Sequence, residues 1–337
     1  MKEIRSLDRK RKLGSFYTKG NPFLHQPFRD WIKQIPKRSK FLEPFAGNGS
    51  ICRLLDEAGY PVNWTKFDID ETLTDVVHSD TLQIFPQGYE VVLTNPPYLS
   101  YHFAKRKKLV IDKELFAGFP SLYMKAIALS LRNAQYVGMI IPESFITSGE
   151  FKERLQTVVS LPYLMFDDTD MPTCLALWGP NQFSESFGVW RGDDFLGNYE
   201  NLATSIVPTE CASRIQFNIV EGQIGLRAID DTLSASIRFC TASEIDPEKI
   251  KHSARLVSRI RVDRLDDLEQ VISVANDILK NWRKNTEDVL LTAFKGFRKD
   301  GCFRRRLDFS NARSILSNAI CKVEGHSHSQ ISALTLF

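Results

Sequence analysis

Short apolar runs and helical patterns alternate through the first half of the chain. The apolar runs read as strands and the amphipathic stretches as helices, with strands in segments 39–43, 63–70, 89–94 and 136–142 and helices in segments 50–60 and 121–134. Strands that are apolar along most of their length and are separated by helices indicate a parallel sheet covered on both faces. We therefore predict an open α/β fold of Rossmann type.

The pattern changes after about residue 185. Segment 222–240 alternates loosely, as half-exposed antiparallel strands do, and segment 265–284 is an amphipathic helix. Segment 295–309, KGFRKDGCFRRRLDF, is basic with interspersed aromatic residues. We predict two domains, residues 1–184 with the Rossmann-like sheet and a smaller α+β domain over residues 185–337.

Composition narrows the class of protein. The chain has 337 residues, of which 43% are hydrophobic and 25% charged, and its net charge is only +3. Any surface for an acidic partner must therefore arise from local clustering of basic residues. The six cysteines form no C-x-x-C pair, the N-terminus lacks the apolar core of a signal peptide, and no run reaches the ~18 apolar residues of a membrane helix. These features predict a cytoplasmic protein with reduced thiols, no metal and no membrane contact.

Glycine and acidic side chains follow the first two predicted strands. In open α/β folds, ligands lie at the carboxyl ends of the strands. The turn EPFAGNGS, residues 43–50, lacks the lysine of a P-loop and the full G-x-G-x-x-G pattern, so it indicates close backbone approach to some other ligand. Asp68 ends the next strand and can accept ribose hydroxyls, and Asp80 can accept an adenine amine. Ordinary capping acids or solvated loop acids remain the alternative for both.

The third strand ends in Asn95-Pro96-Pro97-Tyr98. Asn95 supplies a carbonyl acceptor, and the two prolines lack N–H groups and hold the chain extended. The side-chain oxygen and a neighbouring backbone carbonyl then form two fixed acceptors, which suit an NH2 group with two hydrogens. The Tyr98 ring can stack on a flat substrate. This tetrad predicts a site for a planar amino group.

These motifs resemble those of methyltransferases that use S-adenosylmethionine. Asn95–Tyr98 resembles motif IV and Glu43–Gly49 resembles motif I, while the upstream Gly14–Thr18 resembles motif X, although Lys19 stands where the family often has proline. The order of these motifs is that of the gamma group of DNA adenine-N6 methyltransferases. The resemblance covers about residues 12–180.

The resemblance implies a role for each matching residue. It implies that S-adenosylmethionine is bound by Phe16, Tyr17, Thr18, Glu43, Pro44, Ala46, Gly47, Gly49, Asp68, Ile69, Asp80 and Asn95. It also implies that Asn95 and the Pro96 carbonyl hold the target N6 amine and that Tyr98 stacks on the base. A base must leave the duplex to reach such a site, so base flipping is expected.

Further aromatic and basic residues are candidates for nucleic-acid contact. A second ring should sandwich the base, and we expect Trp178, with Phe145 and Phe166 as competitors; a core position is the alternative for each. The candidates for phosphate contact are basic residues Lys105, Arg106, Lys107 and Lys108 beside the tetrad, and Arg304, Arg305 and Arg306 in the second domain. Solvated charged faces are the alternative.

The leading hypothesis is a site-specific DNA adenine-N6 methyltransferase with duplex DNA as its substrate. It is expected to be the modification enzyme of a restriction-modification system with a separate restriction endonuclease; an orphan enzyme of phage type is the alternative. The tetrad also suits an RNA adenine or a protein glutamine amide, which present NH2 groups too. A separate C-terminal module with basic patches, and motif X at the front, favour DNA. A nucleic-acid-binding module without catalysis is the alternative from another class. An intact glycine turn together with an intact tetrad argues against that last alternative, because binding alone requires neither.

Overall fold

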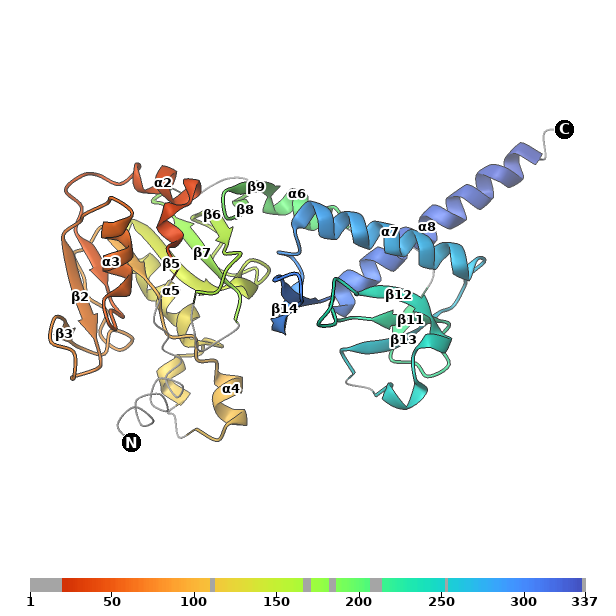
Figure 1. Ribbon diagram of the computed structural model, residues 1–337, viewed down its shortest axis with the longest axis horizontal. Helices are drawn as coiled ribbons and strands as arrows, with labels where there is room; N and C mark the ends of the chain where they lie inside the picture. Colours follow the sequence, from red (N-terminus) through yellow and green to blue (C-terminus); the bar gives the residue numbers. More distant parts are fainter. Residues whose placement is uncertain are drawn as a thin grey trace. The chain divides into compact units, whose positions relative to one another are not determined.

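A computed structural model describes residues 20–109, 113–165, 171–181, 186–206, 214–251 and 254–334, without the side chains of Lys113 and residues 325–334. Two compact units divide between Asn198 and Tyr199 (Figure 1). The sequence placed this boundary at 184/185. The division falls later because the strands at 188–191 and 194–198 pair onto the sheet of the first unit.

The first unit is built on one sheet, which has nine strands among the described residues, in the order β3-β2-β1-β4-β5-β7-β6-β8-β9. The strands are β1 (Phe41–Glu43), β2 (Trp64–Asp68), β3 (Val77–His78), β4 (Val91–Thr94), β5 (Tyr136–Pro142), β6 (Leu155–Ser160), β7 (Thr173–Trp178), β8 (Gly188–Arg191) and β9 (Asp194–Asn198). Strands β3 to β5 in this order are all parallel, and β7 runs antiparallel between β5 and β6. The predicted Rossmann-like sheet is confirmed.

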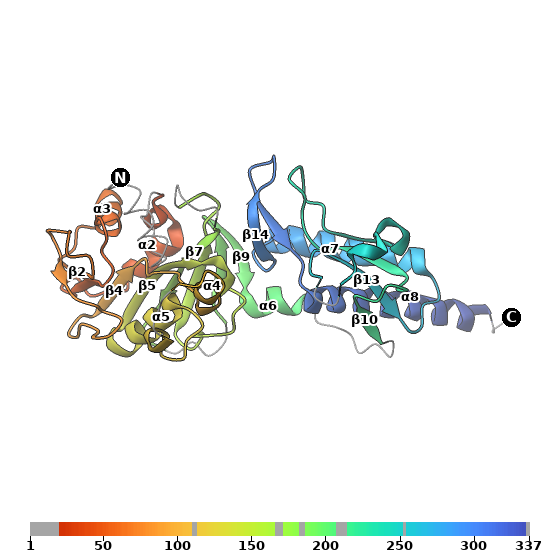
Figure 2. The same cartoon turned by 90° about the horizontal axis from the view of Figure 1, so that it is seen from below.

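Helices cover both faces of this sheet. They are α2 (Gln26–Ile32), α3 (Ser50–Glu57), α4 (Tyr101–Arg106) and α5 (Leu122–Asn133), with 3-10 turns η1 (Pro22–Leu24), η2 (Lys113–Phe116) and η3 (Glu143–Phe145). Figure 2 shows α2 and α3 on one side of the sheet and α5 on the other. Every residue of β4, β5 and β7 is buried, as expected for strands covered on both faces.

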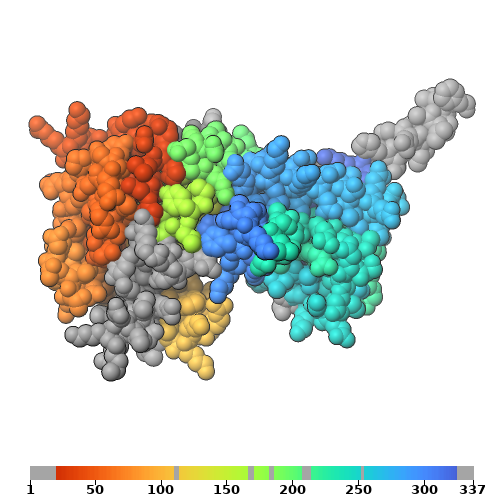
Figure 3. Space-filling model, viewed as in Figure 1, coloured from red at the N-terminus to blue at the C-terminus, as the bar shows by residue number. Residues whose placement is uncertain are grey.

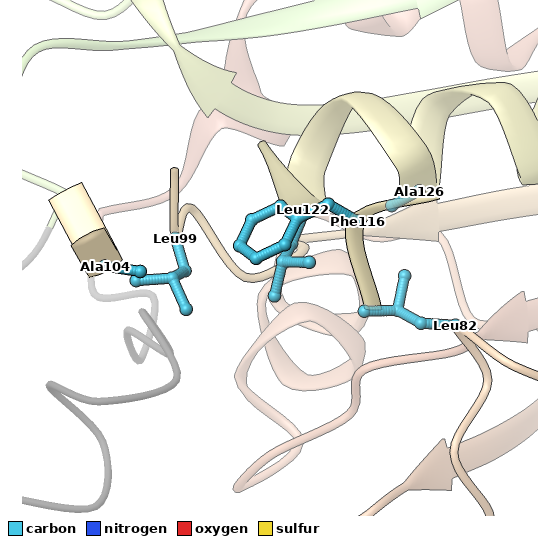
Figure 4. Packing of buried hydrophobic residues seen from close by; sticks show 6 residues of the cluster. All are labelled: Leu82, Leu99, Ala104, Phe116, Leu122 and Ala126. Carbon is cyan, nitrogen blue, oxygen red and sulfur yellow. The ribbon is translucent and has the colours of Figure 1, made fainter. Parts of the chain in front are cut away.

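A hydrophobic cluster fixes the chain that follows the tetrad. It joins Leu99, Ala104 of α4 and Phe116 of η2 to Leu122 and Ala126 of α5, and Leu82 packs on it from the loop after β3 (Figure 4). Because these residues come from four separate segments, their packing holds the segments in one arrangement beside the strand ends.

The second unit has its own core. In the part of this unit that the structure describes, a four-stranded antiparallel sheet and a two-stranded hairpin combine with three helices: β10 (Ile215–Phe217), β11 (Ile224–Arg227), β12 (Arg238–Thr241), β13 (Val257–Val262), β14 (Thr292–Phe297), β15 (Phe303–Arg306), α6 (Tyr199–Thr204), α7 (Leu268–Thr286) and α8 (Phe309–Leu334). Short 3-10 turns lie at η4 (Ala242–Glu244) and η5 (Pro247–Lys249). This is the α+β composition that the sequence predicts. No helix in the described part of the chain has the length and apolarity to cross a membrane.

Candidate functional site

A pocket of about 230 Å³ lies at the carboxyl ends of β1 to β4. The strand order reverses between β1 and β4, and this switch point is where open α/β sheets bind ligands. The pocket brings together eight of the residues predicted from sequence: Pro44, Ala46, Gly47, Asp68, Ile69, Asp80, Asn95 and Pro97. Sequence reasoning missed the other lining residues, among them Phe45, Ser50, Thr81, Leu82, Leu115 and Leu122. These are ordinary hydroxyl and apolar types whose position only the fold reveals.

The glycine turn forms one wall of this pocket and is bonded to the end of β2. Gly47 and Gly49 have φ of 52° and 74°, in the left-handed region that glycine adopts without strain. The Gly47 N–H donates to Asp68 Oδ2 at 2.7 Å, and the Ala46 N–H donates to the Phe67 carbonyl at 2.9 Å. Asp68 therefore orients the turn as well as bordering the pocket.

The loop after β3 also lines the pocket. Thr81 donates through Oγ1 to the Pro44 carbonyl at 2.8 Å, which ties this loop to the end of β1. Asp80 accepts from the Leu82 N–H at 3.1 Å and from Gln83 Nε2 at 2.8 Å. Ile69 borders the pocket with 52% of its surface exposed, an unusual exposure for an apolar side chain.

Glu43 lies beneath the pocket rather than in its lining. Its side chain is fully buried, and its Oε1 accepts from Thr94 Oγ1 and from the Phe45 N–H. Its Oε2 is buried without a hydrogen-bond partner among the described residues. Burial, only partly offset by these two hydrogen bonds, raises the pKa of Glu43 to about 8. The carboxyl is thus mostly protonated at neutral pH.

The tetrad combines a half-buried amide with a buried tyrosine. Asn95 and Pro97 border the pocket, while Pro96 is buried. The Tyr98 side chain is only 7% exposed and packs edge-to-face on Tyr123, with ring centroids 6.4 Å apart. Its hydroxyl lies 2.7 Å from Asn95 Oδ1 and 2.9 Å from the Ile140 carbonyl oxygen. The predicted stacking of this ring on a substrate is therefore not available in this conformation, because packing covers the ring.

The other aromatic candidates lie in the core or outside the described residues. Trp178 is fully buried in β7, where its Nε1 donates to the Phe151 carbonyl at 2.8 Å and its ring packs on Phe145. The hypothesis that Trp178 stacks on a base is therefore wrong for this structure, because the centre of the sheet encloses the side chain. Phe145 is buried likewise. Phe166 lies outside the described residues, as do Phe16, Tyr17 and Thr18.

The basic candidates differ in exposure. Lys105, Arg106, Lys107 and Lys108 are all exposed at the end of α4 and in the turn after it, and Figure 3 shows this gold segment at the surface of the first unit. In the second unit, Arg305 is 2% exposed, so its guanidinium is not offered to a ligand. Arg304 donates through Nε to the Asp230 carbonyl at 2.9 Å.

Arg306 lines a second pocket, of about 650 Å³, in the second unit. Arg255 and Arg313 share this pocket, together with the Phe217 and Phe309 rings, which stack with centroids 4.5 Å apart. The sequence did not indicate Arg255 and Arg313, because both lie outside the basic run at 304–306. Only the fold brings them to one pocket with Arg306.

A search of known proteins identifies one relative by sequence. The type II methyltransferase M.AccI of Acinetobacter calcoaceticus is 25% identical over 276 residues, which are 72% of this chain and 47% of that protein. The resemblance of the sequence to methyltransferases is confirmed. The chain spans about half the length of this relative. No protein-family model matches the chain.

Solved structures give a weaker likeness. A methyltransferase subunit of a type I restriction-modification system from Streptococcus thermophilus matches with a TM-score of 0.36 and 16% identity, over 52% of this chain and 46% of that one. The type IIG restriction endonuclease BpuSI matches with a TM-score of 0.39 and 15% identity, over 53% of this chain and 27% of that one. The assignment of the fold rests on the strand order of the sheet.

Proposed function

We propose that this protein transfers a methyl group from S-adenosylmethionine to the N6 amine of adenine in duplex DNA, as the modification enzyme of a restriction-modification system. The observation that carries the proposal is one pocket bordered by the glycine turn, Asp68, Asp80 and Asn95. Each of these four features follows a different strand. The sheet topology therefore brings four separately predicted features together around one pocket.

The pocket suits a nucleoside that carries an amino-acid tail. Asp68 stands at the end of β2, where a carboxylate can accept ribose hydroxyls. The exposed face of Ile69 offers an apolar surface for adenine, and Asp80 lines the same pocket with a carboxylate for the exocyclic amine of adenine. The glycine turn leaves space for the amino-acid tail, and the fully buried Glu43 at the start of this turn lies outside the pocket lining. S-adenosylmethionine would supply a methyl group already activated on a sulfonium.

Asn95 borders the same pocket and supplies the acceptor for the target amine. The lone pair of adenine N6 is delocalised into the ring, so the free amine is a poor nucleophile. Acceptors on its two hydrogens, the Asn95 side chain and the Pro96 carbonyl, localise that lone pair on nitrogen. The rest of the rate enhancement comes from holding the amine in line with the methyl group.

Basic side chains in both units support DNA as the substrate. The exposed residues Lys105–Lys108 follow the tetrad by fewer than a dozen positions, and their charge suits phosphate contact near the target nucleotide. In the second unit, the arginines at 255, 306 and 313 converge on one pocket. We propose that these two sets bind the DNA backbone, that the target base flips out of the duplex, and that a restriction endonuclease acts separately at the same sequence.

The test is transfer of a tritiated methyl group from S-adenosylmethionine to unmethylated duplex DNA, total RNA and a protein lysate in parallel. Digestion of labelled DNA should release N6-methyladenine. Label in RNA or protein instead would refute DNA as the substrate while keeping the chemistry at Asn95.

Replacing Asn95 with Ala removes one acceptor for the target amine. We expect kcat to fall by about 100-fold or more, because an acceptor aimed at the reacting group acts mainly in the transition state. Binding of S-adenosylmethionine, measured by calorimetry, should stay within about threefold of the wild type. Unchanged turnover in this variant would exclude the proposed role of Asn95.

A further inference from the structure

The Tyr98 hydroxyl lies within hydrogen-bonding distance of two oxygen atoms at the edge of the candidate site. The Tyr98 hydroxyl oxygen lies 2.7 Å from Asn95 Oδ1 and 2.9 Å from the Ile140 carbonyl oxygen. Both distances are those of good O–H···O hydrogen bonds. A hydroxyl carries a single hydrogen, however, so it can fully donate to only one of these acceptors at a time.

The two acceptors are not equivalent. The Ile140 carbonyl belongs to the backbone of the buried strand β5 and can only accept. Asn95 ends in a planar amide, which presents either an acceptor oxygen or a donor NH2 group when it turns about its Cβ–Cγ bond. If the hydroxyl donates to Ile140, its oxygen still accepts a hydrogen bond. The amide satisfies that oxygen only by presenting Nδ2 to it.

We propose that the Tyr98 hydroxyl selects the orientation of the Asn95 amide and is a positioning residue for the reaction. In the recorded arrangement Asn95 Oδ1 faces the hydroxyl. In the productive arrangement the hydroxyl donates to Ile140, accepts from Asn95 Nδ2, and thereby directs Oδ1 toward the pocket that Asn95 borders.

This inference deepens the proposed function and rests on it for the identity of the substrate amine. An incoming amine needs an acceptor, and an amide with NH2 directed toward it would repel its hydrogens. The hydrogen bonds that link Asn95 through Tyr98 to Ile140 exclude that unproductive orientation before the amine binds. Burial of Tyr98, which raises the pKa of its hydroxyl well above the usual range, keeps the donor proton in place at any working pH.

The test compares Tyr98→Phe with Tyr123→Phe. Tyr123 is the buried tyrosine, 8% exposed, whose ring packs edge-to-face on that of Tyr98, so the control removes a comparable buried hydroxyl. We expect Tyr98→Phe to lower kcat about tenfold, the effect of one net hydrogen bond, with the affinity for S-adenosylmethionine and the melting temperature matching those of the control. Equal kcat in the two variants would overturn the proposal.

A second measurement does not depend on methyl transfer. In protein labelled with ¹⁵N at asparagine, the side-chain NH2 signals of Asn95 are those that disappear in Asn95→Asp. We expect Tyr98→Phe to shift these signals and Tyr123→Phe to leave them in place. Unmoved signals in Tyr98→Phe would refute the contact itself. If the wild type methylates no DNA but the signals shift as expected, the choice of substrate fails and the positioning role stands.

Discussion

Glu43 shows how a single buried carboxyl can make stability depend on pH. Its ordinary pKa of 4.5 is raised to about 8, with burial as the main cause. The folded protein therefore holds a proton that the unfolded chain releases between these two values. Stabilisation is fully present below pH 4.5 and is lost as pH rises through about 8.

Replacing Glu43 with Gln should remove this dependence. A glutamine oxygen can still accept from Thr94 and the Phe45 N–H, so the local packing is retained. We expect the free energy of unfolding of the wild type to fall by about 4 kcal/mol more than that of the variant between about pH 5 and 8. Urea denaturation across this range measures both slopes. Parallel slopes for the two proteins would contradict the assignment of the shift to Glu43.

The glycine turn is the element that couples backbone geometry to ligand binding. Gly49 has φ of 74°, and a Cβ placed there meets nothing within 4 Å. Gly59, after α3, has φ of 87° and is equally open. Neither glycine lines the pocket itself, but Gly49 stands between the lining residues Asn48 and Ser50 in the glycine turn. An alanine would therefore meet similar backbone strain at the two positions, one in the candidate ligand-binding turn and the other at an ordinary helix end.

Alanine at either position should cost stability, and only one should cost binding. We expect Gly49→Ala and Gly59→Ala each to lower the free energy of unfolding by about 1 to 2 kcal/mol, because alanine is strained at positive φ. Only Gly49→Ala should weaken binding of S-adenosylmethionine, since the strained turn moves away from the cofactor. Titration calorimetry measures the affinity of each variant for S-adenosylmethionine. Equal affinities in the two variants would show that the turn does not contact the cofactor.

The elements predicted from sequence were those with strong local patterns. The runs at 89–94 and 136–142 are apolar along most of their length and correspond to β4 and β5, and the helix predicted over 121–134 is α5 at Leu122–Asn133. Strands β8 and β9 have weaker alternation, so their membership of the first unit could not be inferred. The prediction that Trp178 stacks on a base was wrong for a similar reason. The sequence of an apolar strand does not reveal whether other elements cover an aromatic side chain in it.

The whole molecule has two cores with separate sources of stability. In the second unit, fully buried Asp230 accepts from Arg283 at 2.9 Å and from Arg298 at 3.1 Å. It also accepts from the Arg305 N–H, so one carboxylate joins the end of α7 to the β14–β15 hairpin. Burial opposes ionisation, but the hydrogen bonds from Arg283 keep the pKa of Asp230 below its ordinary value. Its contribution is therefore present above the ordinary carboxyl pKa and is lost as pH falls below it.

Asp230→Asn should destabilise the second unit without affecting the cofactor site. Loss of the carboxylate leaves Arg283 and Arg298 with less compensation for their buried charge, and we expect a cost of about 3 to 5 kcal/mol. Asp231→Asn is the matched control, because Asp231 is exposed and an asparagine oxygen can keep its bonds to the Leu233 and Ser234 N–H groups. Calorimetry should show an earlier transition for Asp230→Asn alone, with unchanged binding of S-adenosylmethionine. A normal transition would exclude the ionic cluster as a main source of stability.

The placement of β7 between β5 and β6 has a consequence for synthesis on the ribosome. Strand β6 leaves the ribosomal exit tunnel before β7, but in the folded sheet β7 lies between β6 and β5. Until Thr173–Trp178 has emerged, the nascent chain carries two apolar strands whose facing edges are both unpaired. Such edges are templates for intermolecular pairing, so this interval of translation is when the chain depends most on holding chaperones.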